Sequence, residues 1–178
     1  MERYRSLEHA AAVATALAPL PAPIRDVLRG AHVLTDTDPA TVGLHYFRAV
    51  GDGRSYDATS HCVYPRHQTH LPRDRRVVTV VLFGADATDP DIILHEFGHV
   101  LQHRLHYEQP PPAIRALNTY AARDYGEAFA VAFRAWCNDS RDTDGRLHQN
   151  RDELRAVDPR LAAFFDALAS TASATLSH

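Results

Sequence analysis

The sequence predicts an α+β fold, in which a small mixed sheet packs on a long central helix and further helices follow along the chain. Three observations support this prediction. Residues 77–83 (VVTVVLF) are short, β-branched and apolar, as in a buried strand. Residues 90–106 form one long helical segment, and the chain after residue 113 contains further helical segments. Three or four strands followed by packed helices are typical of the α+β class.

Length and composition restrict the class of protein. The chain has 178 residues, enough for one domain spanning residues 1–178, and 45% of them are hydrophobic, as in an ordinary globular protein. The formal net charge of −3 gives no general attraction to nucleic acid or to an anionic membrane surface. No apolar run reaches the ~20 residues that a membrane-spanning helix needs. We expect neither a nucleic-acid partner nor a membrane span, and the oligomeric state stays open.

The N-terminal part predicts two helices. Residues 4–18 favour a helix that ends at the prolines following it, and residues 24–29 favour a second helix that ends at Gly30. The Ala-rich stretch 10–18 is too weakly apolar, and its flanks too polar, for a signal peptide. We expect instead a surface helix, and the compartment stays open between the cytoplasm and export. The side chains expected to pack against the body are Leu7, Val13 and Leu17.

The middle of the chain predicts the strands. We expect strands at residues 31–35, 44–50 and 77–83, a further one within 55–64, and a polar loop at 65–76. The cysteines are Cys62 and Cys137. Two cysteines do not make a disulfide framework, and we expect free, partly buried thiols.

The rest of the chain predicts helices. The long helix at 90–106 has Thr88 or Asp89 as its cap, Pro90 in its first turn and a favourable acidic charge at Asp91. The helices expected after it span residues 113–121, 125–138, 149–156 and 159–170.

The motif that carries chemistry lies in the long helix. His95-Glu96-Phe97-Gly98-His99 places two imidazoles four residues apart, on one face of the helix, where both can reach one metal ion. Glu96 flanks that face and can act as a base toward water. The neighbouring residues are large and apolar, so the helix is expected to be buried. Buried His and Glu side chains are costly unless they are ligated or hydrogen-bonded, and this favours a zinc site.

A catalytic zinc needs a third protein ligand, and Glu127 is the best candidate. It opens a second apolar helix, in which Phe129, Phe133 and Trp136 form a packing stripe. A third histidine six residues after His99 is absent, because position 105 is Leu. The remaining histidines of the long helix lie too far along it to share the ion and are expected to be polar surface residues. They are His103 and His106.

These residues together resemble the catalytic domains of the anthrax lethal factor-like metallopeptidases, a group that includes the Pro-Pro endopeptidases. The likeness rests on HEFGH at 95–99, on Tyr120, and on Glu-x-Phe-Ala-x-x-Phe at 127–133, with six residues between Tyr120 and Glu127. It covers roughly residues 77–136. No match upstream of residue 77 supports it, and the chain has no room for the delivery and docking domains of the larger members.

The resemblance implies a zincin-like domain with one zinc ion per chain, which hydrolyses peptide bonds of a peptide or protein substrate. The implied ligands are His95, His99 and Glu127. Glu96 would be the general base, and Tyr120 would donate a hydrogen bond to the developing oxyanion. Residues 77–83 would form a sheet edge that pairs with the substrate backbone.

Other interpretations remain open. A peptide deformylase also uses HExxH but takes a cysteine as third ligand, and Cys62 lies in the sequence SHCVYP, which lacks the expected Gly-Cys-Leu-Ser context. A non-catalytic module of the same fold, which binds a peptide or senses a partner, would not need the base Glu96. A second metal site is the weakest alternative, because polar loop histidines are usually only solvated. Its ligands would be His61, His67 and His70.

Overall fold

The computed structural model of the chain describes residues 7–36, 60–63, 78–107, 121, 125–138 and 150–171. The elements in chain order are α1 (Leu7–Leu17), α2 (Ala22–Leu28), β1 (His32–Asp36), β2 (His61–Val63), β3 (Thr79–Phe83), the 3-10 helix η3 (Gly84–Thr88), α4 (Pro90–Leu105), α5 (Tyr125–Cys137), α6 (Arg151–Val157) and α7 (Pro159–Ser170). The described part mixes strand and helix and is mostly helical, which is compatible with the expected α+β class.

The sheet has three strands in the order β1-β3-β2. β1 runs parallel to β3, with Val33 beside Val80, and β2 runs antiparallel to β3, with Cys62 beside the same valine. β3 is therefore the middle strand and is hydrogen-bonded on both sides. The expectation that residues 77–83 form the sheet edge that receives substrate is wrong, because β1 and β2 already pair with both edges of this strand.

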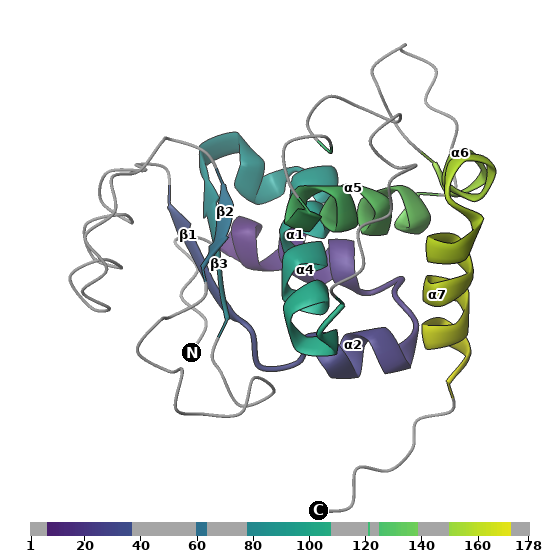
Figure 1. Cartoon of the computed structure of the whole chain (residues 1–178). Coiled ribbons are helices and arrows are strands. Elements are labelled where there is room, and N and C mark those ends of the chain that lie inside the picture. The colour runs from purple at the N-terminus through teal and green to yellow at the C-terminus, as the bar shows by residue number, and fades with distance from the viewer. Residues whose placement is uncertain are drawn as a thin grey trace, which may run out of the picture.

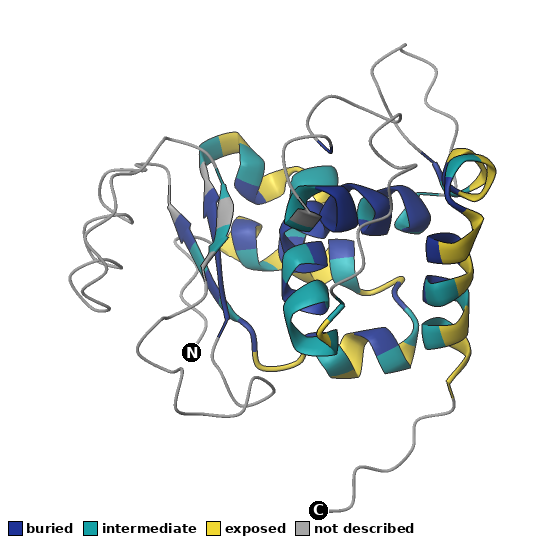
Figure 2. Ribbon diagram, viewed as in Figure 1, coloured by how far each residue is buried: buried dark blue, intermediate teal, exposed yellow. Residues whose placement is uncertain are grey.

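Helix α4 lies at the centre of the molecule. Figure 1 shows the sheet to one side of α4, helix α5 next to it, and α6 and α7 beyond α5. α4 also contacts α1 and α2, so it is covered from several directions. Figure 2 shows many buried positions along α4 and α5, whereas α7 mixes buried, intermediate and exposed positions. The largest fully buried side chains are Phe129, Phe133, Phe165, Ile24, Leu82, Ile93, Leu101, Leu154, Leu161, Val33 and Val78.

Helix α5 packs on two sides. Its aromatic stripe faces α7, with the rings of Phe129, Phe133 and Trp136 centred 5.2, 5.6 and 5.8 Å from the ring of Phe165. The indole N–H of Trp136 also donates to Asp166 Oδ1 at 2.9 Å. Aromatic pairs at such separations stabilise beyond the area that they bury. The stripe predicted from the sequence is confirmed, and it holds α5 firmly against α7.

Local sequence signals explain where α4 begins and ends. The Asp89 carboxylate accepts hydrogen bonds from the backbone N–H groups of Asp91 and Ile92, at 2.8 and 3.4 Å. Asp89 is therefore the N-cap, and Pro90 occupies the first turn, where no amide donor is required. The helix ends where His106 adopts a left-handed conformation with φ of 53°.

Several expectations for the N-terminal part can be checked. Gly30, with φ of 80°, ends the turn after α2 as predicted. In α1, Val13 is buried and Leu17 is half-buried, but the expected packing of Leu7 is wrong, since 91% of it is exposed at the first position of the helix. Both cysteines are half-buried and free of disulfides, as expected.

Other predicted segments are described only in part or lie outside the described residues. The strand expected within 55–64 is confirmed at residues 61–63. The strand at 44–50 and the loop at 65–76 lie outside the described part, and of the helix at 113–121 only residue 121 is described, in a turn.

None of the described helices is long and apolar enough to cross a membrane.

Candidate metal centre

Two imidazoles project from one face of α4. His95 and His99 are four residues apart, and their rings meet edge to face with centroids 4.9 Å apart. Their side chains are 10% and 13% exposed, so both lie largely out of solvent. The helical spacing seen in the sequence therefore places both rings at one point.

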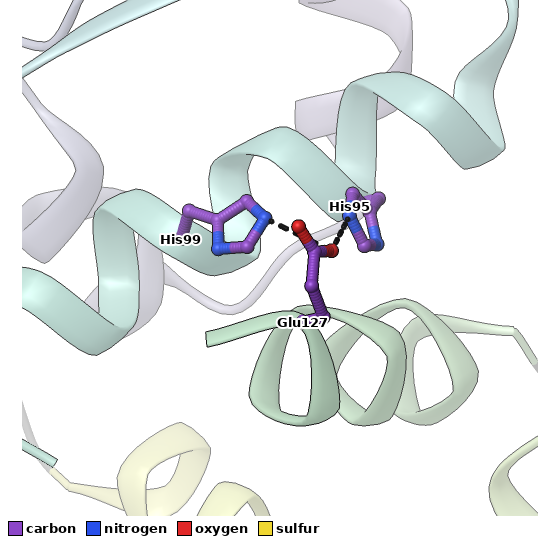
Figure 3. A group of neighbouring side chains, drawn as sticks. All are labelled: His95, His99 and Glu127. Atoms are coloured by element: carbon purple, nitrogen blue, oxygen red, sulfur yellow. Dashed lines mark hydrogen bonds and ion pairs between the residues drawn. The ribbon is translucent and has the colours of Figure 1, made fainter. Parts of the chain in front are cut away.

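Glu127 approaches the same point from α5. Its Oε2 lies 3.0 Å from His95 Nε2 and 3.5 Å from His99 Nε2 (Figure 3). Glu127 stands in the first turn of α5, and α5 packs against α4 more extensively than any other pair of described elements. The third ligand expected from the sequence is thus brought to the first two, although 28 residues separate it from His99 along the chain.

The spacing of the three side chains fits a small cation. One ligand atom from each of His95, His99 and Glu127 lies within 4.8 Å of the others, and no other such group occurs in the described part of the chain. Atoms bound at about 2.0–2.2 Å to a tetrahedral zinc ion lie roughly 3.3 Å apart. The distances of 3.0 and 3.5 Å to Glu127 Oε2 fall on either side of that value.

Glu96 lies beside this group and is buried, with 4% of it exposed. Among the described residues, its Oε2 has no hydrogen-bond partner. An unpartnered buried carboxylate oxygen is costly, and a native structure keeps one only for a reason, such as a catalytic role or a bound ion or water. The residues present therefore fit a metal ion with a proton acceptor next to it.

The pKa shifts of Glu96, Glu127 and His95 fit a metal site with a proton acceptor next to it. Burial raises the pKa of Glu96 to about 7, and the nearby carboxylates of Glu127 and Asp86 act in the same direction. Burial alone would also raise the pKa of Glu127, but hydrogen bonds from His95 and His99 outweigh it and hold that pKa at about 2. Burial lowers the pKa of His95, which favours the neutral imidazole. A neutral imidazole and an ionised carboxylate are the forms that bind metal.

Asp86 is a residue of this site that the sequence did not suggest. It lies in η3, between β3 and α4, and its Oδ2 accepts a hydrogen bond from Ser60 Oγ at 2.7 Å. Its charge reaches Glu96, and it contributes to the raised pKa of that residue. One acidic residue in a turn carries no signal that would have marked it beforehand.

The other residues that the sequence suggested for a site lie apart from this group or outside the described residues. His103 and His106 lie further along α4 and C-terminal to it, and neither belongs to the His95–His99–Glu127 group. Cys62 lies in β2 and does not belong to it either. The oxyanion donor Tyr120 lies outside the described residues, as do His67 and His70 of the alternative second site. The assignments that concern Tyr120 and the second site stay predictions.

Comparison with known proteins assigns neither a family nor a function to this chain. No family model, curated protein or solved structure matches this chain. A function for the site must therefore be argued from the site itself.

Proposed function

We propose that this chain is a zinc-dependent endopeptidase with a zincin-like domain, similar to the anthrax lethal factor-like metallopeptidases. The observation that carries the proposal is the convergence of His95, His99 and Glu127 from two helices, with the buried Glu96 next to them. The motif HEFGH and the six-residue spacing between Tyr120 and Glu127 support the same family. The substrate class is a peptide or a protein.

The proposed metal ligands are His95 Nε2, His99 Nε2 and a carboxylate oxygen of Glu127. Two imidazoles and one carboxylate are a donor set that suits zinc and leaves a fourth position open, as in catalytic zinc sites. When bound, zinc supplies Lewis acidity, which acidifies water and polarises a carbonyl group. The protein's part is to hold the three donors in place, away from bulk solvent.

Glu96 is the proposed general base and acid. Its carboxylate would accept a proton from the attacking water and return it to the leaving amine. In the metal-free protein, burial raises the pKa of this carboxyl to about 7. A fully solvated carboxylate with an ordinary pKa would be a weaker proton acceptor. The burial of Glu96 thus prepares it for both steps.

Tyr120 is the proposed donor to the developing oxyanion. This role rests on the family resemblance, because Tyr120 stands seven positions before Glu127 as in that family's pattern. The substrate backbone would pair with an outer strand of the sheet, and of the two described outer strands β2 packs more closely against α4 than β1 does.

The residues of the site argue against a peptide deformylase and against a non-catalytic binding module. A deformylase-like site would use a cysteine as third ligand, but Glu127 is the residue in reach of both histidines. A binding module would have no use for a buried Glu96 carboxylate whose Oε2 has no hydrogen-bond partner among the described residues. Hydrolysis is the function that uses all four side chains.

Metal content is the first test of this proposal. Elemental mass spectrometry on protein purified without added metal should find about one zinc per chain in the wild type and much less in Glu127→Ala. The loss is expected because a two-histidine site lacks the third ligand. Wild-type protein that carries no zinc and takes up none would end the proposal.

Peptide cleavage is the second test. Against a diverse peptide library, Glu96→Gln should keep its zinc but lose cleavage by roughly 100-fold or more, because it has no base. Tyr120→Phe should keep its zinc and lower kcat by roughly 100-fold, as expected for removal of an oxyanion donor. Undiminished cleavage by Glu96→Gln would contradict the role of the base. An emptied metal site in Tyr120→Phe, or an unchanged kcat, would contradict the oxyanion role.

A further inference from the structure

Gly98 is a glycine in the middle of the buried helix α4, between His95 and His99. Glycine is disfavoured in a helix interior relative to alanine, because it loses more backbone freedom and adds no side-chain contacts. A glycine inside a helix therefore suggests a packing or functional reason. The neighbouring helix supplies that reason here.

The backbone of α5 comes close to Gly98. A Cβ atom at this position would lie 2.8 Å from the Cα of Ala130, 3.2 Å from its carbonyl oxygen and 3.3 Å from its Cβ. The nearest atom belongs to the backbone, so no side-chain rotation can remove the clash. Ordinary contact begins at 3.4 Å, so a methyl group would require the helices to separate by roughly 0.6 Å at this point.

Helix α5 has little freedom to make that movement without loss. Another side of it is packed against α7 through the rings of Phe129, Phe133 and Trp136 around Phe165. Protein interiors are densely packed and transmit strain rather than absorb it. A displaced α5 would therefore shift as a unit or tilt against α7.

The Gly98–Ala130 contact also determines how close the Glu127 carboxylate comes to the two imidazoles. Ala130 follows Glu127 by about one turn of α5, and Gly98 immediately precedes His99 on α4. A separation of the helices at Gly98 therefore moves the Glu127 carboxylate away from both imidazoles, to which it is now 3.0 and 3.5 Å distant. Metal–ligand distances tolerate only about 0.2 Å. After such a separation, Glu127 could bind the ion only by changing its side-chain conformation.

We propose that Gly98 is a positioning residue of the metal centre: the absence of a side chain lets α5 approach α4 closely enough for Glu127 to share one ion with His95 and His99. This inference rests on the proposed zinc site and adds what determines its geometry. Gly98 touches neither metal nor substrate, and it acts through the separation of two helices.

The test is the zinc affinity of Gly98→Ala, measured by competition with a chromogenic chelator. Binding should be roughly 10- to 100-fold weaker than in the wild type, as when other supporting residues of metal sites are changed. The visible spectrum of the cobalt-substituted protein should also change, because it reports ligand geometry. The matched control is Ile24→Ala, which removes a fully buried side chain of α2, a helix that packs against α4 and α7. It should lower the melting temperature and leave zinc affinity and the cobalt spectrum unchanged.

A second variant covers the case in which Gly98→Ala does not fold. Ala130→Val adds bulk from the α5 side of the same contact and should weaken zinc binding in the same direction. Wild-type zinc affinity in folded Gly98→Ala, or in Ala130→Val, would overturn the positioning role while leaving the proposed zinc site intact. An equal loss of affinity in Ile24→Ala would overturn it as well, because the effect would then be general destabilisation. A wild type that binds no zinc would overturn the proposed site and this inference together.

Discussion

Glu96 and Glu127 show how surroundings give one residue type two roles. Both carboxylates lie near the same imidazoles, yet the pKa of Glu96 is raised to about 7 and that of Glu127 is held at about 2. Glu96 is buried with an oxygen that has no hydrogen-bond partner among the described residues, whereas Glu127 Oε2 lies 3.0 and 3.5 Å from two imidazole nitrogens. Near neutral pH one can exchange a proton and the other stays charged. Pairs of titratable groups separated in this way are typical of acid–base sites.

The raised pKa of Glu96 predicts how the stability of the metal-free protein depends on pH. Its pKa is about 7 when folded and 4.5 when unfolded, so the stability contributed by the protonated form is complete below pH 4.5. That contribution is lost as the pH rises from 4.5 to 7. The loss is roughly 3 kcal/mol, from about 1.4 kcal/mol per unit of pKa. Glu96→Gln has no such carboxyl, so it should exceed the wild type in stability at pH 8 and lose this advantage at pH 4.5.

Urea denaturation with a chelator present, at both pH values, measures this effect. The control is Glu8→Gln on α1, where the carboxyl is exposed, and it should change stability little at either pH. An advantage of Glu96→Gln that is equal at both pH values would mean that the carboxyl does not titrate as the structure implies.

At the residue scale, the sequence predicted the three side chains that converge but not their surroundings. His95 and His99 follow from helical spacing, and Glu127 from its isolation among apolar neighbours. The Ser60–Asp86 hydrogen bond could not be inferred, because it joins residues 26 positions apart that carry no motif. The glycine in HEFGH was visible, but which backbone approaches it depends on the packing of two helices.

At the scale of elements, the α4–α5 pair is the unit that builds the site. Three contacts fix it: Glu127 with the two histidines, Gly98 with Ala130, and Asn138 Nδ2 donating to Asp91 Oδ1 at 3.1 Å. These contacts involve both the start and the end of α5, so its register on α4 is determined over its whole length. Interhelical distances depend on the side chains at the point of contact, which explains why a glycine there matters.

Helix limits were predictable, whereas strand pairing was not. The prolines, the Asp89 cap and the Gly30 turn are local signals, and the helices begin and end close to where these signals place them. The place of β3 in the sheet depends on β1, which precedes it by more than forty residues. A strand's own composition does not specify its partners, so an apolar strand expected at an edge proved to be the middle one.

For the whole molecule, the proposed metal centre is part of the main core. One cluster of buried side chains includes residues of every described helix and of the sheet, and the site lies where α4 and α5 meet within it. Ion binding at such a junction is linked to the folding of the whole unit, because the unfolded chain cannot keep three ligands together.

This linkage predicts that zinc raises thermal stability. At a free zinc concentration 100 times its Kd, binding should add about 2.7 kcal/mol. For a chain of this length, this corresponds to a rise of roughly 5–10 °C in melting temperature. Calorimetry or circular dichroism on the metal-free protein, with and without zinc, measures the rise.

Magnesium is the control ion and should have little effect, since it prefers an octahedral shell of oxygen ligands. Glu127→Ala should lose most of the rise, because it leaves only two ligands. A rise of equal size in Glu127→Ala would mean that zinc stabilises the protein from another site, and the role of the α4–α5 junction would be wrong.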